Sequence, residues 1–135
     1  MILIDSNIWC YFFDSSSKEH KSVSKFVDKT LEKEEILTNT VVLIEVAHFL
    51  IKNLGSVIGR KKMDAFLDFP MRIVDFDYKQ AKDSISLLCE YSTFGVGGRD
   101  STLLAAMQRA KISRIATHDK AFKKVEWIDV IDPTH

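Results

Sequence analysis

The most constraining feature of the sequence is its first segment, in which the apolar residues Met1 to Ile4 run without interruption and end at Asp5. An apolar run this short is typical of a strand buried on both faces, as in the middle of a parallel sheet. In open α/β sheets, ligands bind at the carboxyl ends of the strands. Asp5 is therefore expected at a ligand-binding edge, although an Asp in a strand-to-helix loop also has a purely structural use as a turn residue.

The rest of the chain alternates predicted helices with predicted strands. Apolar stripes at helical spacing predict helices over residues 18–33, 40–52, 56–69, 78–91 and 101–110, and short apolar runs predict strands over 36–38, 71–76, 114–117 and 127–131. The residues of the segment 8–13 form an aromatic cluster that we expect to be largely buried. This alternation, without repeats or a linker, predicts a single α/β domain over residues 1–135 with a mostly parallel sheet.

Charge and cysteine content limit the classes of protein. The 19 basic and 19 acidic residues balance, so no general attraction to nucleic acid is expected, although a local basic surface is compatible with zero net charge. Cys10 and Cys89 cannot form a zinc cluster alone and do not suggest a secreted disulfide scaffold. There is no signal-peptide pattern, and the longest apolar stretch, 41–51, is too short to span a membrane. We therefore expect a cytoplasmic protein without a membrane partner.

Glu45 is the unusual residue of the predicted helix 40–52. That helix has almost no polar face, so we expect it to be packed nearly all round. A buried carboxylate without a partner costs several kcal/mol, so an Arg, a Lys or a metal should meet Glu45, unless it lies at an edge that faces water. His48 completes a Glu-x-x-His pattern, but the second copy that a di-iron bundle needs is missing, and His48 is interpreted as a helix-face residue.

Two further acids stand at the ends of predicted elements. Asp100 precedes the helix 101–110 and, taken alone, is explained by N-terminal capping, while the glycines before it are interpreted as a flexible entry to that helix. Asp119 follows the strand 114–117 and repeats the pattern of Asp5. If these two strands are neighbours, their backbones lie about 4.8 Å apart and the carboxylates repel each other unless a cation intervenes. Together with Glu45, these acids are hard oxygen ligands that suit Mg²⁺ or Mn²⁺.

At this point the chain resembles the PIN-domain nucleases, and among them the short VapC-type toxins of toxin–antitoxin pairs. The resemblance covers essentially the whole chain. It rests on four segments: Ile4-Asp5-Ser6-Asn7, the helix segment 42–50 around Glu45, Arg99-Asp100 ahead of the segment 103–107, and Thr117-His118-Asp119 followed by Phe122. It implies a three-layer α/β fold in which a mostly parallel five-stranded sheet is flanked by helices.

The resemblance also implies a function, a site and partners. The acidic tetrad Asp5, Glu45, Asp100 and Asp119 would bind Mg²⁺ or Mn²⁺ and cleave RNA by metal-activated water, with Glu45 bound directly or through water. Asn7 and Thr117 would orient those carboxylates. Basic residues at the rim would guide the RNA backbone, namely Arg99, Lys52, Arg60, Lys61 and Lys62. A homodimer and a small antitoxin protein whose tail enters the active groove are the partners implied.

Other classes of protein fit less well. A haloacid-dehalogenase-like phosphatase would need an Asp at the position of Asn7, and a receiver domain would need a better phosphoacceptor than Asp75. A PIN-domain nuclease of RNA processing, or a catalytically silent PIN-like module that binds RNA or protein, stays open as an alternative. The sequence does not indicate which RNA would be cleaved.

Overall fold

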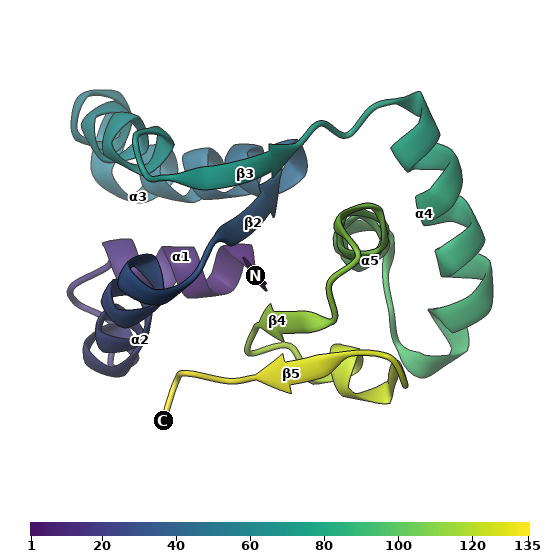
Figure 1. Ribbon diagram of the computed structural model, residues 1–135. Coiled ribbons are helices and arrows are strands. Elements are labelled where there is room, and N and C mark those ends of the chain that lie inside the picture. The colour runs from purple at the N-terminus through teal and green to yellow at the C-terminus, as the bar shows by residue number, and fades with distance from the viewer.

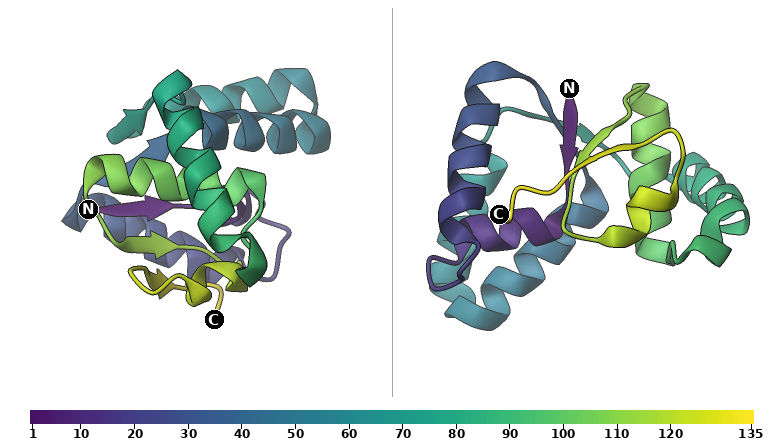
Figure 2. Two further views of the ribbon diagram at one scale, coloured as in Figure 1. Left: turned by 90° about the vertical axis from the view of Figure 1, so that its right-hand side faces the viewer. Right: turned by 90° about the horizontal axis from the view of Figure 1, so that it is seen from below.

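The computed structural model describes residues 1–135, which form one five-stranded sheet between two layers of helices (Figure 1). The strands are β1 (Ile2–Ile4), β2 (Ile36–Asn39), β3 (Met71–Val74), β4 (Arg114–Ala116) and β5 (Asp129–Ile131). The helices are α1 (Ser6–Phe13), α2 (His20–Lys33), α3 (Thr40–Leu67), α4 (Tyr78–Tyr91) and α5 (Gly98–Ala110), with 3₁₀ turns η1 (Ser92–Phe94) and η2 (Lys120–Lys124). Helices α1, α2 and α3 cover one face of the sheet, and α4 and α5 cover the other (Figure 2).

The strand order, β3-β2-β1-β4-β5, places β1 at the centre. All four strand pairs are parallel, and Leu3 of β1 lies opposite Leu37 of β2 on one side and Ile115 of β4 on the other. The three-layer α/β fold with a parallel sheet is therefore confirmed. Strand order reverses between β1 and β4, and this switch point is where open α/β sheets bind ligands.

Helix α1 is an element that the sequence did not predict. Its aromatic residues carry no clear helical stripe, but Asp5 caps its first turn by accepting a hydrogen bond from the Ser6 N–H (2.6 Å). Trp9 is fully buried, and its ring centroid lies 4.7 Å from that of Phe66 in α3. Tertiary packing of these rings stabilises the helix, and the sequence has no periodic apolar stripe that would have predicted it.

Helix α3 contains both helices predicted over residues 40–69. They meet at Gly55, whose φ of 84° and ψ of 168° are not helical and suit only glycine. A Cβ atom at Gly59 would lie 2.8 Å from Cα of Ile51, so the two halves of α3 touch backbone to backbone and lie side by side (Figure 2). Glycine is required at both positions, for the turn at Gly55 and for the close approach at Gly59.

The burial expected for α3 is wrong. Only Val42, Val46 and Leu50 of its first half are buried, and Ile44 is 71% exposed. The residues expected to point inward from the second half are also mostly exposed: Val57, Ile58, Ala65 and Leu67, with only Phe66 buried. The physical reason is that α3 covers the sheet with one side, so its remaining apolar side chains have no partner within this chain.

Helix α4 buries a different face from the predicted one. Ile85 and Cys89 of the expected apolar stripe are exposed, whereas Gln80 and Ser84 are buried against α5. The amide nitrogen of Gln80 donates a hydrogen bond to the carbonyl oxygen of Ala105 (3.2 Å), whereas its Oε1 and the Ser84 hydroxyl have no hydrogen-bond partner. Apolar periodicity does not reveal a buried polar residue of this kind.

Length and composition alone would also allow α3 to cross a membrane, with a mean hydropathy of 1.7 over its most apolar 18 residues. A single helix of this kind is weak evidence, because helices of soluble domains pass the same test. Here α3 turns at Gly55 and packs its first half against α1. The absence of a membrane partner stays a prediction.

Candidate active site

Asp5 occupies the switch point at the carboxyl end of β1. Its side chain is fully buried, and its backbone N–H donates to the carbonyl oxygen of Ala116 in β4 (2.9 Å). Oδ1 accepts from the Ser6 N–H, and Oδ2 accepts from the Thr117 hydroxyl (2.7 Å). These contacts fix the carboxylate in one orientation at the junction of two strands.

Arg99 links Asp5 to two other acids. Its guanidinium donates to Oδ1 of Asp5 (2.8 Å), to Oε1 of Glu45 (3.3 Å) and to Oδ1 of Asp100 (3.0 Å). The three carboxylates come from β1, α3 and α5, and we call Asp5, Glu45 and Asp100 the acidic cluster. The cation expected to meet Glu45 is therefore Arg99, which the sequence had indicated only as an RNA contact at the rim.

The start of α5 holds both Arg99 and Asp100. Gly97 is the N-cap residue, and its N–H donates to Oδ2 of Asp100 (3.2 Å), which leaves Oδ1 for Arg99. The helix therefore begins three residues earlier than predicted, and Asp100 is not its N-cap residue: it lies in the first turn and accepts from the N–H of the N-cap residue, while the same side chain belongs to the acidic cluster. The Arg directly before this acid is the local signal that could have indicated the ion pair of Arg99 with Asp100.

The pKa values of the acidic cluster reflect crowded negative charge. Burial raises the pKa of Glu45 above its ordinary value; the charge of Arg99 opposes this rise and that of Asp5 adds to it. Burial also raises the pKa of Asp100, and the charges of Asp119 and Asp5 add to the effect. Burial alone would lower the pKa of Arg99, but the hydrogen bond and charge of Asp5 outweigh it and raise that pKa. A cation in this place is therefore strongly favoured.

Asp119 lies beside the acidic cluster rather than on Arg99. It begins η2, where its Oδ1 accepts from the Ala121 N–H (2.9 Å), and its own N–H donates to the Thr117 hydroxyl oxygen (3.0 Å). The Asn7 amide also approaches that oxygen (3.5 Å). Thr117 thus connects Asp5, Asp119 and Asn7, which is the arrangement that an orienting role of Asn7 and Thr117 would need.

The donor set fits a divalent ion in its chemistry. At least one carboxylate oxygen of each member of the acidic cluster lies within 3.3 Å of an Arg99 guanidinium nitrogen, and such hard oxygens suit Mg²⁺ or Mn²⁺. As the side chains lie, no three His, Cys, Asp or Glu residues form a metal-binding group, and the Arg99 guanidinium contacts all three members of the acidic cluster. The chemistry of the residues therefore fits a divalent ion, and the cation that they contact in this structure is Arg99.

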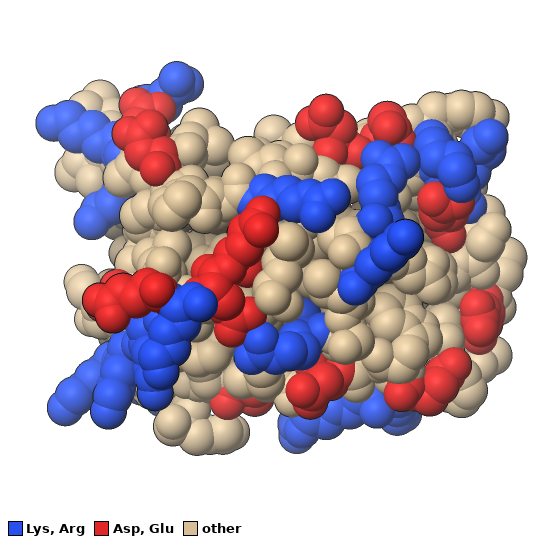
Figure 3. Space-filling view, in the orientation of Figure 1, with Lys and Arg blue, Asp and Glu red and all other residues tan.

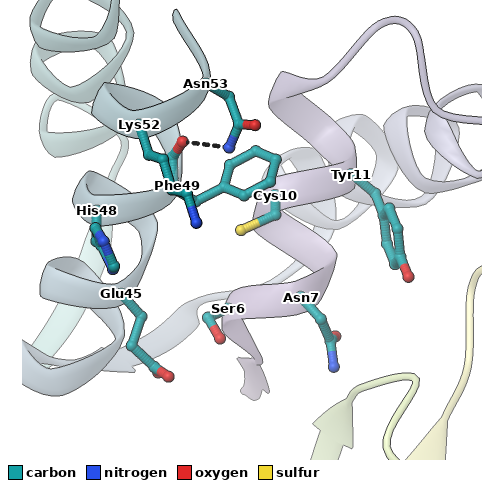
Figure 4. Close-up of a pocket in the computed structure, with 9 residues that line it drawn as sticks. All are labelled: Ser6, Asn7, Cys10, Tyr11, Glu45, His48, Phe49, Lys52 and Asn53. Atoms are coloured by element: carbon teal, nitrogen blue, oxygen red, sulfur yellow. Dashed lines mark hydrogen bonds between the residues drawn. The ribbon is translucent and has the colours of Figure 1, made fainter. Parts of the chain in front are cut away.

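A cavity of about 560 Å³ opens beside Glu45, between α1 and α3 (Figure 4). Glu45 and Ser6 lie at one end of it and Asn53 at the other, with Lys52 and His48 also in its lining. Burial raises the pKa of Cys10, another lining residue, to about 12, so this thiol stays protonated and is no nucleophile at neutral pH. Lys52, one of the residues predicted to contact RNA, therefore lines the same cavity as Glu45 of the acidic cluster.

The other predicted RNA contacts lie along the second half of α3. Arg60, Lys61 and Lys62 are exposed, and Arg60 forms an ion pair with Asp64 (3.0 Å). They are available to a ligand on the surface, but no contact joins them to the acidic cluster.

The protein therefore has a three-layer α/β fold with a parallel sheet, and carboxylates gather at the switch point of that sheet. These two features define an α/β protein with an acidic ligand site. The family model of the PIN domain matches residues 2–128, and the chain belongs to the PIN-domain family.

The chain is also similar to proteins named as VapC ribonucleases and to solved VapC structures. Ribonuclease VapC13 of Mycobacterium tuberculosis is 24% identical over 123 residues, which cover 90% of this chain and 92% of that protein. The crystal structure of VapC20 from the same organism, described as a Sarcin-Ricin loop cleaving toxin, matches with a TM-score of 0.79 at 16% identity over 91% of this chain and 93% of that one. VapBC2 from Rickettsia felis, bound to a promoter DNA fragment, matches with a TM-score of 0.76 at 20% identity, covering 97% and 98%.

Proposed function

We propose that the protein is a Mg²⁺- or Mn²⁺-dependent endoribonuclease that hydrolyses RNA phosphodiester bonds. The observation that carries the proposal is the meeting of Asp5, Glu45 and Asp100, from three separate elements, on one cationic group at the switch point of the sheet. Membership in the PIN-domain family and the likeness to proteins named ribonucleases support it.

In this proposal the residues of the site have distinct tasks. Asp5, Glu45, Asp100 and Asp119 are the residues that would hold the ion or ions. A bound divalent ion lowers the pKa of water and neutralises charge that develops on the phosphate oxygens. Thr117 and Ser6 keep the Asp5 oxygens in place, while the Gly97 N–H does so for Asp100.

An assay with single-stranded RNA tests the proposal. We expect endonucleolytic cleavage with Mn²⁺ or Mg²⁺, and we expect removal of divalent ions with a chelator to slow it by about a thousandfold or more, because the acids alone cannot activate water at neutral pH. Adding back Mn²⁺ in excess of the chelator should restore the rate. Cleavage that continues unchanged in the chelator would contradict the proposal.

A catalytically silent PIN-like module is the second candidate, and one observation favours it. Acids crowded without a metal would be costly, but Arg99 already neutralises part of their charge. Such a module would bind RNA without cleaving it under any metal condition. The same assay, read as binding against cleavage, therefore separates the two candidates.

For the RNA-contacting surface we propose Lys52, Arg99 and the exposed Arg60, Lys61 and Lys62, together with a second basic region on α2. Lys and Arg side chains gather over α2 and over the second half of α3 on the face in Figure 3. A cleft of about 450 Å³, which we call the lysine cleft, is lined by Lys18, Lys21, Lys25, Ser22, Thr134 and His135. Thr134 brings this cleft close to the site, because its hydroxyl lies 3.2 Å from Nδ1 of His118, the residue before Asp119.

Reversing two charges of the lysine cleft should weaken RNA binding. Lys21 and Lys25 form no ion pair within the chain, so both are free to contact phosphates. In the double variant Lys21→Glu/Lys25→Glu, the slope of log K against log salt concentration should fall by about 1.4, or roughly 0.7 for each lost phosphate contact with a single strand. The control, Lys82→Glu/Lys111→Glu, changes two exposed lysines on the α4–α5 side of the sheet that also form no ion pair, and it should keep the slope. Equal slopes in both variants would remove the lysine cleft from the RNA surface.

We also propose protein partners and a cytoplasmic location. The exposed apolar side chains of α3 are candidates for a homodimer contact or for a small antitoxin protein: Ile44, Ile51, Leu54, Val57, Ile58 and Leu67. The likeness of the fold to that of a toxin–antitoxin complex from Klebsiella pneumoniae supports an antitoxin. Light scattering of the purified chain tests the homodimer, and co-purification with the product of the neighbouring reading frame tests the antitoxin.

A further inference from the structure

Arg99 is the one basic side chain that contacts the acidic cluster. Among the ion pairs of the chain, those of Asp5, Glu45 and Asp100 all lead to Arg99 and to no Lys, His or second Arg. Both outer nitrogens of its guanidinium are used, and Nη2 also approaches Oδ2 of Asp5 (3.3 Å). A planar fork of donors can bridge carboxylates in this way, whereas the point charge of a lysine cannot.

The same side chain is in a position to leave. Its exposed fraction is 30%, against 0% for Asp5, so one side of the guanidinium faces solvent. Arg99 lies in the first turn of α5, directly after Gly97 and Gly98. Its backbone can therefore stay helical while the long, partly exposed side chain rotates outward.

From these contacts we propose that Arg99 is the resident counter-ion of the metal site: it holds the acidic cluster together without metal, and a divalent ion binds by displacing its guanidinium. The inference rests on the proposed metal-dependent function. It follows from the contacts of the one guanidinium with Asp5 (2.8 Å), Glu45 (3.3 Å) and Asp100 (3.0 Å), the same oxygens that a divalent ion would need. Two cations cannot occupy the site together, because both need the same oxygens.

The exchange lowers the apparent affinity for metal. When a binding-competent state is only fractionally populated, the apparent dissociation constant rises by the inverse of that fraction. The Arg-paired arrangement is the competing state here, and removing Arg99 should abolish it. Metal should then bind more tightly, at the expense of the stability of the metal-free protein, in which three carboxylates would be left to repel one another.

Titration calorimetry with Mn²⁺ in the absence of RNA tests the inference on the full-length chain. We expect Arg99→Gln to bind Mn²⁺ on the order of tenfold or more tightly than the unaltered protein. We also expect its melting temperature without metal to fall by about 4 °C or more. Arg109→Gln is the matched control on the same helix, since Arg109 pairs with Asp77 away from the cluster, and it should leave the affinity for Mn²⁺ unchanged.

Arg99→Lys is the second variant, for use if Arg99→Gln does not fold. Lysine keeps the positive charge but can bridge fewer carboxylates, so the metal-free protein should stay folded. Its affinity for Mn²⁺ should exceed that of the unaltered protein and stay below that of a folded Arg99→Gln variant. In addition, the side-chain Nε–Hε resonance of Arg99 should shift when Mg²⁺ is added to the unaltered protein, while that of Arg109 stays in place.

The outcomes separate this inference from the proposed function. If Mn²⁺ binds to the unaltered protein but equally or more weakly to the folded Arg99 variants, the displacement is overturned and the metal site stands. If neither the unaltered protein nor any folded variant binds Mn²⁺, the displacement and the metal-dependent function both fail. Tighter binding in the Arg99 variants alone supports the exchange, whatever the RNA cleavage assay shows.

Discussion

Replacement of Asp5 by asparagine is expected to slow metal-dependent RNA cleavage by about a thousandfold or more, because an amide oxygen is a weak substitute for a carboxylate on a divalent ion. Asp5 is the most deeply placed member of the acidic cluster and is held by Ser6, Thr117 and Arg99 at once. The variant should remain folded, because asparagine has nearly the same shape and can still accept the hydrogen bond from the Ser6 N–H. Single-turnover cleavage, together with a thermal melt of each variant, is the measurement.

Two companion variants complete this experiment. Asp100→Asn should give the same loss of cleavage, since Asp100 shares Arg99 and the crowded charge with Asp5. Asp77→Asn is the control: Asp77 also caps a helix and pairs with an arginine, Arg109, but it lies outside the cluster. It should leave cleavage unchanged. Full activity in either Asp5→Asn or Asp100→Asn would remove the assignment of these acids to catalysis.

The largest effect on stability is expected from Trp9→Ala, with a loss of about 3–5 kcal/mol in the free energy of unfolding. Trp9 is fully buried and packs against Phe66, Phe69 and Phe12, with ring centroids 4.7, 5.8 and 5.9 Å away. Alanine would leave a cavity between α1 and α3, the two helices that flank the acidic cluster. Urea unfolding followed by circular dichroism measures the loss.

Trp9→Phe is the control for that variant. The indole Nε1 of Trp9 is buried and has no hydrogen-bond partner, so its removal sacrifices no hydrogen bond. A phenyl ring keeps most of the packing, and the loss should stay below about 1.5 kcal/mol. If Trp9→Ala were as mild as Trp9→Phe, the aromatic cluster would not be what joins α1 to α3.

The sheet was predictable from the sequence because its strands are short apolar runs that end in polar residues. Two apolar runs show this pattern: Met1–Ile4, which ends at Asp5, and the strand before Asp119. Such runs are typical of buried parallel strands. Helix α1 escaped prediction because the packing of Trp9 and its neighbouring rings, rather than a periodic stripe, stabilises it. Periodicity reports which residues are apolar, and it does not report what covers them, as the exposed Ile44 and Val57 of α3 show.

The site was predictable in part for the same kind of reason. A carboxylate buried in an apolar helix needs a cation, and this argument led from Glu45 to a cation without naming it, although the Glu45 side chain is 32% exposed. Its identity depends on the distance between α3 and the start of α5, which no local pattern contains. Arg99 therefore seemed to be a surface residue in the sequence, whereas the structure places its guanidinium among Asp5, Glu45 and Asp100.

The most direct test of the metal site is anomalous diffraction from crystals of the protein grown with Mn²⁺. The account predicts a manganese peak bound by carboxylate oxygens of Asp5, Asp100 and Asp119, with Glu45 bound directly or through water and the Arg99 guanidinium moved out of the acidic cluster. A map without manganese at these acids, with Arg99 still bridging them at saturating Mn²⁺, would contradict it.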